Sequence, residues 1–154
     1  MTAISPALAA PARHQATSRI LLIEDDDLDV ISFYRALEAR GLKIELQRAR
    51  NAIEAFDMLR LQRMEGRDDN MLVVLDLNMP CMNGIQFLHA LRADAELSSA
   101  IVIAFTTSSN AMDIKAAYRH HVAAYVVKGV VEDTTRSLVS LIDAYLRTVT
   151  MPVR

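Results

Sequence analysis

The segment Val73-Val74-Leu75-Asp76-Leu77-Asn78-Met79-Pro80, continued by Cys81-Met82-Asn83-Gly84, decides the fold of this chain. Its uninterrupted Val and Leu residues predict a strand that is buried on both faces. The strand ends on the carboxylate of Asp76, and Pro and Asn-Gly turn signals follow. An unpaired buried charge would cost several kcal/mol, which is comparable with the whole folding free energy. Asp76 therefore either caps the helix that begins near Asn83 or meets partner groups from distant parts of the chain.

The composition indicates a single domain with an aliphatic core. The chain has 154 residues, 52% of them hydrophobic but only 5% aromatic, and a formal net charge of -2. No apolar run approaches the roughly 18 residues that a membrane span needs, and the near-neutral charge argues against a large basic face for nucleic acid. One cysteine, Cys81, cannot form an intramolecular disulfide, which predicts a reducing, cytoplasmic compartment. An ordinary loop residue is the simpler interpretation of Cys81 than a reactive thiol.

The first 18 residues differ from the rest of the chain. They are rich in Ala, Pro, Ser and Thr, and they lack the basic start and apolar stretch of a secretory signal. We expect residues 1–18 to form a flexible tail or a partner-bound arm. Residues 19–154 then form the domain, with a C-terminal helix and a short tail.

Short apolar runs alternate with amphipathic helices from Arg19 onward. The pattern predicts helices from Asp26 or Asp27 to Gly41, from the Asn51 cap to between Met64 and Gly66, from Asn83 onward with Leu91 on its apolar side, and over about residues 111–119 and 132–149. It predicts strands over residues 20–23, 43–48, 71–76, 101–105 and 124–127. Such alternation indicates an α/β fold with a parallel sheet covered on both faces. Right-handed crossovers favour the flavodoxin-like, doubly wound (βα)5 arrangement, with the five strands in the order 2-1-3-4-5.

Polar residues stand where four of these strands end. Glu24 and Asp25 follow the first strand, Asp76 the third, Thr106 the fourth and Lys128 the fifth. In this fold the carboxyl ends of the strands meet at one edge of the sheet, where ligands bind. Each residue alone would be an ordinary helix start, turn or surface residue. Their repeated position at strand ends predicts a shared pocket.

The predicted pocket is suited to a hard divalent cation. Neighbouring carboxylates repel one another, and a bound cation relieves this repulsion. Mg²⁺ prefers oxygen ligands, so Asp25 and Asp76 could bind it directly, Glu24 through water, and Asn78 by its main-chain carbonyl. No His or Cys stands at these strand ends, so a zinc site is not expected.

The remaining groups are those that phosphoryl transfer needs, namely positioning and charge neutralisation. Asp76 would be the nucleophile and form an acyl phosphate. The Lys128 ammonium would pair with Asp76 at rest and with the phosphoryl group afterwards. The Thr106 hydroxyl would donate a hydrogen bond to a phosphoryl oxygen.

Four pieces of the chain, in this order and spacing, resemble the response-regulator receiver domain of two-component signalling. They are residues 20–26 (ILLIEDD), 75–84 (LDLNMPCMNG), 105–108 (FTTS) and 124–128 (AYVVK), and the likeness covers residues 19–149. It implies that Asp76 accepts phosphate from a histidine kinase and that Glu24 and Asp25 organise Mg²⁺. It also implies that Thr106 and Lys128 bind the phosphoryl group and that the Tyr125 ring changes rotamer on activation.

A narrower likeness is to single-domain regulators that are partnered with bacterial phytochrome kinases. Residues 75–80, 106–109 and 141–152 carry it. It implies a bacteriophytochrome as the kinase. It also implies a homodimer, formed through the surface of residues 111–119, 124–127 and the last helix, or through the last helix and the tail.

Besides Glu24, a frequent variant of the commoner Asp, two positions depart from the family pattern. Gly129 stands where the family usually has Pro after the lysine, so we expect a trans bond there, or a cis bond held by tertiary contacts. His121 stands where Gly often ends the preceding helix, and histidine tolerates a left-handed backbone better than most residues. We therefore interpret His121 as a turn residue, and a phosphohistidine role for it or for His120 is disfavoured.

The sequence leaves three functional hypotheses. The first is a stand-alone phosphoacceptor switch, not an enzyme with turnover, that signals through protein contacts, because only five residues follow Val149. The second is a binding or dimerisation module that ignores phosphate. The third is a Mg²⁺-dependent hydrolase of the aspartyl-phosphate type. Such hydrolases carry a second Asp two residues after the nucleophile, where this chain has Asn78, so turnover of small phosphate esters is not expected.

Overall fold

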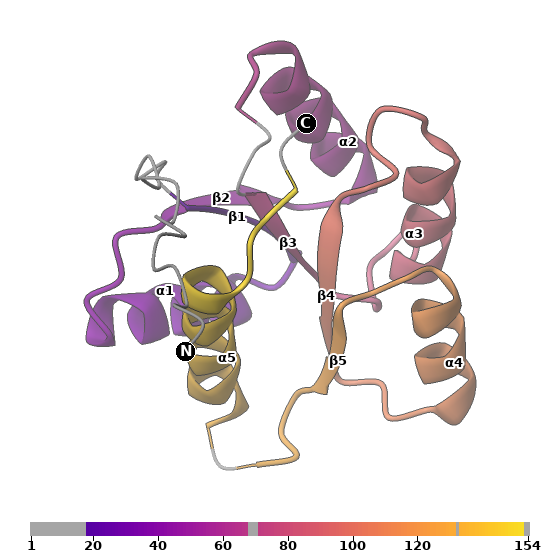
Figure 1. The fold of residues 1–154 in the computed structure, drawn as a ribbon. Coiled ribbons are helices and arrows are strands. Elements are labelled where there is room, and N and C mark those ends of the chain that lie inside the picture. Colours follow the sequence, from indigo (N-terminus) through magenta and orange to yellow (C-terminus); the bar gives the residue numbers. More distant parts are fainter. Residues whose placement is uncertain (1–17, 68–70, 132, 153–154) are drawn as a thin grey trace, which may run out of the picture.

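The computed structural model describes residues 18–67, 71–131 and 133–152. Its centre is a parallel sheet of five strands in the order β2-β1-β3-β4-β5, as predicted (Figure 1). The strands are β1 (Arg19–Ile23), β2 (Glu45–Ala49), β3 (Met71–Leu75), β4 (Ile101–Thr106) and β5 (Ala124–Val127). The predicted tail, residues 1–18, lies outside the described residues except for Ser18.

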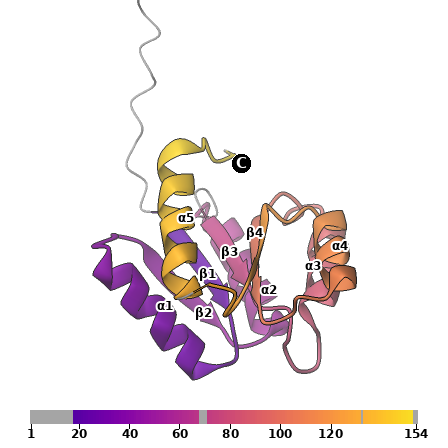
Figure 2. The ribbon, with the colours of Figure 1, turned by 90° about the horizontal axis from the view of Figure 1, so that it is seen from below.

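Five helices cover the two faces of the sheet. They are α1 (Asp27–Ala39), α2 (Ala52–Met64), α3 (Gly84–Ala93), α4 (Ala111–Arg119) and α5 (Thr134–Thr148). Helices α1 and α5 lie on one face, and α2, α3 and α4 lie on the other (Figures 1 and 2). Within the described residues, none of these helices has the length and apolar character needed to cross a lipid bilayer.

The core has two halves because successive strand residues point to opposite faces. On the α1 and α5 side, the alternate β-strand residues Leu22 and Val74 pack with Phe33 of α1. On the other side, Leu21 and Val73 belong to the half-core of α2 and α3. Every residue of β3 is buried, as expected for the central strand of a doubly covered sheet.

Side-chain caps fix where the helices near the sheet edge begin. Asp26, not Asp27, caps α1, and its carboxylate accepts hydrogen bonds from the backbone of Leu28 and Asp29. Asn83 caps α3 in a reciprocal capping box with Gln86. These caps satisfy amide groups that would otherwise have no partner in the first helical turn.

Two predicted boundaries were wrong by two residues. Strand β2 begins at Glu45 rather than Lys43, because β1, its only neighbour, starts at Arg19, which lies opposite Glu45. Helix α5 begins at Thr134 rather than Glu132. Asp133 precedes it in a left-handed conformation (φ 55°) and caps the helix through the amide of Arg136.

The two departures from the family pattern adopt the expected backbone. His121 has φ 57°, so it ends the turn after α4 in the left-handed region. The described residues contain no cis peptide bond, so the Lys128–Gly129 bond is trans, and Gly129 has φ 77°. A glycine at this position gives the chain after Lys128 a conformation that most residues disfavour.

Gly84 is the one glycine whose lack of a side chain is required by close packing. A Cβ atom there would lie 2.6 Å from the Leu77 Cα and 2.9 Å from the Asp76 carbonyl oxygen. The Gly84 amide also donates to the Leu77 carbonyl at 2.9 Å. The first residue of α3 is therefore pressed against the backbone that follows β3, and it sets the path of the loop after Asp76.

We expect Gly84→Ala to lower the free energy of unfolding by about 1–3 kcal/mol, because the backbone must move to admit the methyl group. Urea denaturation would measure this loss. Gly41→Ala is the control: Gly41 has φ 64° but no atom within 4 Å of the added Cβ, so only backbone strain of about 1 kcal/mol applies. A loss no larger than that of the control would contradict the packing argument.

Candidate functional site

The strand register brings the predicted residues to one edge of the sheet. Ile23 lies opposite Leu75, so the residues that follow them, Glu24 and Asp76, emerge side by side. The Asp76 amide donates to the Ile23 carbonyl at 3.0 Å. On the other side of the sheet centre, the Lys128 amide donates to the Thr106 carbonyl at 2.8 Å. The structure therefore places the four predicted strand ends at one edge of the sheet.

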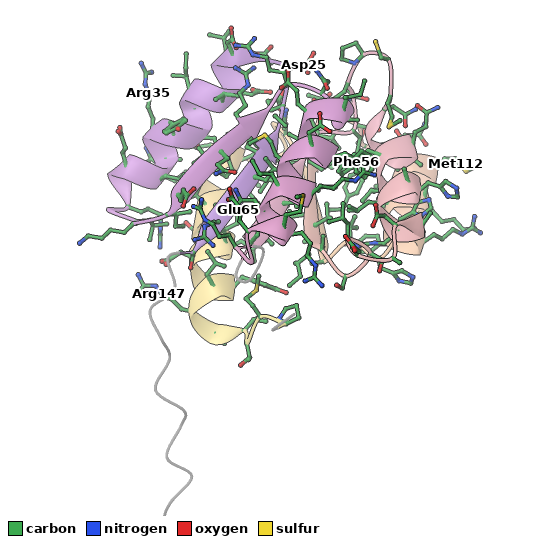
Figure 3. The ribbon with its side chains drawn as sticks, turned by 90° about the horizontal axis from the view of Figure 1, so that it is seen from above. Asp25, Arg35, Phe56, Glu65, Met112 and Arg147 are labelled. Atoms are coloured by element: carbon green, nitrogen blue, oxygen red, sulfur yellow. The ribbon has the colours of Figure 1, made fainter. Side chains whose placement is uncertain are left out.

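Three carboxylates form the acidic wall of this pocket. One oxygen each from Glu24, Asp25 and Asp76 lies within 4.8 Å of the other two. Glu24 and Asp76 are buried, whereas Asp25 is exposed. Figure 3 shows Asp25 at the end of the sheet, far from Arg147 at the C-terminal end of α5. Two carboxylates are thus held by the fold, and the third lies at the mouth.

The Lys128 ammonium closes the pocket and forms an ion pair with Asp76, as predicted, but its shorter contacts are with Glu24 and Asp29. Its Nζ lies 2.7 Å from Glu24 Oε2 and 2.6 Å from Asp29 Oδ2, but 3.8 Å from Asp76 Oδ2. It also lies 5.1 Å from the centre of the Phe105 ring. The hydrogen bonds of the ammonium therefore go to Glu24 and Asp29, and its interaction with Asp76 is a longer-range attraction.

Burial and charge act in opposite directions on the two buried partners. Burial disfavours the charged form of Lys128, but the hydrogen bonds to Asp29 and Glu24 and the charge of Asp76 outweigh it, so its pKa is raised. The pKa of Glu24 is also raised, mainly because burial disfavours the carboxylate, with a smaller contribution from Asp76. Several carboxylates share one ammonium, so the pocket as a whole is strongly negative.

Asp29 is a site residue that the sequence analysis missed. It lies in the first turn of α1, and its amide donates to the cap residue Asp26. The spacing from Asp29 to the buried Phe33 is one helical turn, which places Asp29 beside the core-facing stripe of α1. That spacing could have identified Asp29. The four successive acidic residues at 24–27 made it look like one more acidic residue at a helix start.

Asn78 contributes its side chain as well as its backbone. Its amide nitrogen Nδ2 donates to Thr106 Oγ1 at 3.3 Å and to Thr107 Oγ1 at 3.0 Å, and its backbone N donates to Asp76 Oδ1 at 3.1 Å. Thr106 is fully buried. Asn78 therefore connects the loop after β3 to the end of β4. The predicted ligand role of its main-chain carbonyl stays a prediction.

Tyr125 connects β5 to the loop between β4 and α4. Its hydroxyl donates to the Ser108 carbonyl at 3.0 Å. Partial burial raises the pKa of Tyr125, and the hydrogen bond offsets this only in part. Ser108 in turn donates through its hydroxyl to Asp113 in the first turn of α4, at 2.6 Å. The Ser108 amide also donates to Thr106 Oγ1 at 3.3 Å, so polar contacts run from the pocket to α4.

The other singled-out residues lie outside the pocket. Cys81 is exposed, with φ 69°, in the loop after Asp76. The carbonyl groups of His120 and His121 accept hydrogen bonds from Arg92, which also binds the carbonyls of Ser98 and Ala100 before β4. The two histidines therefore lie at the amino-terminal edge of the sheet, opposite the pocket, and a role in phosphate chemistry has no support there.

The donor set fits a hard cation. Mg²⁺ takes carboxylate oxygens at about 2.0–2.1 Å in an octahedron and keeps several waters, so ligand oxygens lie about 3–4 Å apart. The carboxylate oxygens of Glu24, Asp25 and Asp76 need only a small approach to reach this spacing. The group contains oxygen ligands alone, with neither sulfur nor imidazole nitrogen, which is the chemistry of Mg²⁺ or Mn²⁺ rather than zinc.

This fold and pocket place the chain in a known family. A sequence profile of the response regulator receiver domain matches residues 20–140, and the chain belongs to that family. Response regulators of this family act in two-component signalling.

Two curated relatives are similar along most of their length. Response regulator Rcp1 of Synechocystis sp. is 30% identical over 135 residues, which are 86% of this chain and 92% of Rcp1. The probable methanogenesis regulatory protein FilR2 of Methanothrix harundinacea is 31% identical over 128 residues, which are 82% and 83% of the two chains.

Solved structures agree in fold and extent. The Mn²⁺-bound form of Rcp1 superimposes with a TM-score of 0.73 at 30% identity and covers 88% of this chain and 99% of its own. The phosphorylated cyanobacterial phytochrome response regulator RcpA gives 0.76 at 28% identity, with 89% and 99% covered. The relatives of this chain therefore include phytochrome-associated single-domain regulators, as the narrower likeness implied.

The raised pKa of Glu24 has a consequence for stability. A group whose pKa is raised in the folded state adds stability below its ordinary pKa of 4.5, and this contribution is lost as the pH rises through the raised value. Glu24→Gln removes that titration. With a chelator present, the free energy of unfolding of the variant minus that of the wild type should increase from about pH 4 to about pH 7.

Denaturant titrations at several pH values would measure the difference. Glu38→Gln, which removes an exposed glutamate from α1, is the matched control. A flat difference for Glu24→Gln would show that folding does not raise the pKa of Glu24, and a decreasing one would show that the folded state stabilises its carboxylate.

Proposed function

We propose that this chain is a phosphoacceptor switch that takes a phosphoryl group from a histidine kinase onto Asp76 in the presence of Mg²⁺. The observation that carries the proposal is the pocket itself. A buried carboxylate lies within 4.8 Å of two others and 3.8 Å from a mostly buried ammonium, at the ligand-binding edge of the sheet. Neither a structural core nor a helix start needs this combination.

Asp76 is the nucleophile of the proposed reaction. A carboxylate oxygen attacks phosphorus, the new O–P bond forms as the P–N bond to the kinase imidazole breaks, and the electron pair leaves with the imidazole. The backbone N–H of Asn78 holds Asp76 Oδ1, so Oδ2, which faces Lys128, is the freer oxygen. Lys128 and Thr106 neutralise the phosphoryl oxygens by charge and by a hydrogen bond.

The acidic wall serves the same step. Glu24, Asp25 and Asp76, with the Asn78 carbonyl, would hold Mg²⁺, which supplies positive charge to the phosphoryl oxygens. Because Glu24 and Asp76 are buried, the fold holds their carboxylates in place before the phosphoryl group arrives. We expect slow rather than rapid loss of the phosphoryl group. A hydrolase of the aspartyl-phosphate type needs an Asp at position 78 as its acid and base, and this chain has Asn78 there.

The response of the fold runs through Thr106 and Tyr125. When the Thr106 hydroxyl turns to the phosphoryl group, its contact with the Asn78 amide at 3.3 Å is broken, and the loop after β4 is released. The Tyr125 hydroxyl, bound to that loop at Ser108, then loses or changes its partner. Phosphorylation thus shifts a pre-existing equilibrium between two arrangements of the loop and the ring.

The proposed output surface is the side of β5, α4 and α5 next to this ring. A groove of about 400 Å³ lies along β5, the loop after it and α5, and its lining includes Tyr125, Val130, Val131, Leu138 and Leu141. Val130 and Val131 are 71% and 52% exposed. Figure 3 shows Met112 projecting from α4. We propose a second copy of this chain as the occupant of this surface, which gives a homodimer.

The proposed kinase is a bacteriophytochrome. Support comes from the relatives, since RcpA is a phytochrome response regulator by name, and from the segments over residues 75–80, 106–109 and 141–152. We also propose a cytoplasmic location for this chain, and that location stays a prediction.

One observation favours the second candidate, a module that binds partners regardless of phosphate. The apolar groove beside α5 is open while Lys128 still holds Glu24 and Asp29, so a partner need not await phosphorylation. Sedimentation with and without beryllofluoride, a phosphoryl mimic, separates the two functions. A changed association constant supports the switch, and an identical one supports the constitutive module.

We expect Asp76→Asn to abolish labelling by a small phosphodonor such as phosphoramidate in the presence of Mg²⁺. The side-chain amide of Asn lacks the negatively charged oxygen that attacks phosphorus. Asp57→Asn, an exposed acid on α2, is the matched control and should label like the wild type. Mass spectrometry would detect the added phosphoryl group, and circular dichroism would confirm the fold. Undiminished labelling of Asp76→Asn would remove Asp76 from its proposed role.

A further inference from the structure

The Lys128 ammonium has more carboxylate partners than the proposed phosphoacceptor chemistry requires. Glu24 is buried and holds one hydrogen bond at 2.7 Å. Asp29 holds a second at 2.6 Å, although its side chain is 41% exposed. The distance to Asp76, 3.8 Å, is too long for a hydrogen bond. The shorter contacts therefore hold the ammonium on the α1 side of the pocket.

We propose that Asp29 is a positioning residue that competes with phosphorylated Asp76 for the Lys128 ammonium and so weakens the phosphorylated state. This inference rests on the proposed function, since it concerns the same pocket. Asp29 is not one of the three carboxylates that could hold the metal, and its side-chain contact in the pocket is with Lys128.

The backbone at Asp29 is held in the first turn of α1, so its carboxylate attracts the Lys128 ammonium toward α1. Its backbone amide is bound by the Asp26 cap, which locks the first turn of α1. Lys128 is held from the opposite end because it follows the last residue of β5, and its side chain is only 12% exposed. The Asp29–Lys128 contact therefore joins α1 to the end of β5 across the pocket.

Two effects of Asp29 oppose phosphorylation, and they have the same sign. The ammonium must move toward Asp76 to bind a phosphoryl oxygen, and doing so stretches or breaks its contact with Asp29. The negative charge of Asp29, next to the ammonium, also repels the added phosphoryl charge. Glu24 exerts a similar pull on Lys128 but belongs to the acidic wall, so only Asp29 can be removed without altering the metal ligands.

The same residue favours the resting site. By keeping the ammonium away from Asp76, Asp29 leaves that carboxylate available to the cation and to the phosphodonor. Without Asp29, Lys128 would approach Asp76 and compete with Mg²⁺ for its oxygen. The proposal thus predicts opposite changes for the two ligands, whereas general damage to the pocket would weaken both.

The test uses Asp29→Asn and two ligands, Mg²⁺ alone and beryllofluoride at saturating Mg²⁺. We expect beryllofluoride to bind about two- to five-fold more tightly, the range that a part-exposed ion pair contributes. Mg²⁺ alone should bind about two-fold or more weakly. Calorimetry would give the Mg²⁺ affinity, and the ¹⁹F NMR signal of the bound mimic would give the second affinity.

Two variants control for charge and for geometry. Asp27→Asn removes the same charge from the same turn of α1, but Asp27 pairs with Arg48 and not with Lys128, so both affinities should stay within about two-fold. Asp29→Glu keeps the carboxylate and should return both affinities toward wild-type values.

Each outcome is decisive. Unchanged or weaker beryllofluoride binding by Asp29→Asn overturns the inference, and so does an equal gain in Asp27→Asn, which would show a general charge effect. If the wild type and every variant fail to bind beryllofluoride, the proposed function itself fails. Binding by the wild type that Asp76→Asn abolishes establishes the site independently of Asp29.

Discussion

The attraction between one buried ammonium and the carboxylates around it is the interaction on which this pocket depends. Lys128 comes from β5, Glu24 from the end of β1 and Asp29 from α1, so the contacts join both sides of the sheet centre. Without a cation at that position, the buried carboxylates of Glu24 and Asp76 would lose their shared positively charged partner, which would destabilise the pocket. The hydrogen bonds at 2.6 and 2.7 Å make this arrangement of acids stable before any ligand binds.

The pocket still contains more carboxylates than the single ammonium of Lys128 can neutralise. Burial raises the pKa of Glu24 in spite of its bond to Lys128, which shows that the ammonium compensates only in part. This residual charge is the physical reason that a divalent cation would bind there. It also explains how the addition of one phosphoryl group can change the conformation, because the partners of a single ammonium must then be redistributed. Stability and function are thus set by the same few charges.

The polar contacts beyond the pocket are weaker and more easily exchanged. Asn78 reaches Thr106 at 3.3 Å and Tyr125 reaches a loop carbonyl at 3.0 Å, and each of these contacts lies on the side of α4. Neutral hydrogen bonds contribute about 1 kcal/mol each, so their loss is within the range that phosphate binding can supply. The charged contacts of Lys128 and the neutral contacts of Asn78 and Tyr125 therefore have different roles.

The sequence by itself determined the alternation of strands and helices, the strand order and the five strand-end residues, because periodic apolar burial and parallel register act over short, regular distances. It also determined the left-handed turn at His121 and, within two residues, where the helices and strands begin. Tertiary structure alone decided which carboxylate the Lys128 ammonium binds, since that choice compares distances between side chains on separate elements. For the same reason, the Asp29 contact and the Asn78 amide bridge could not be predicted: their partners lie 99 and 28 residues away in the chain.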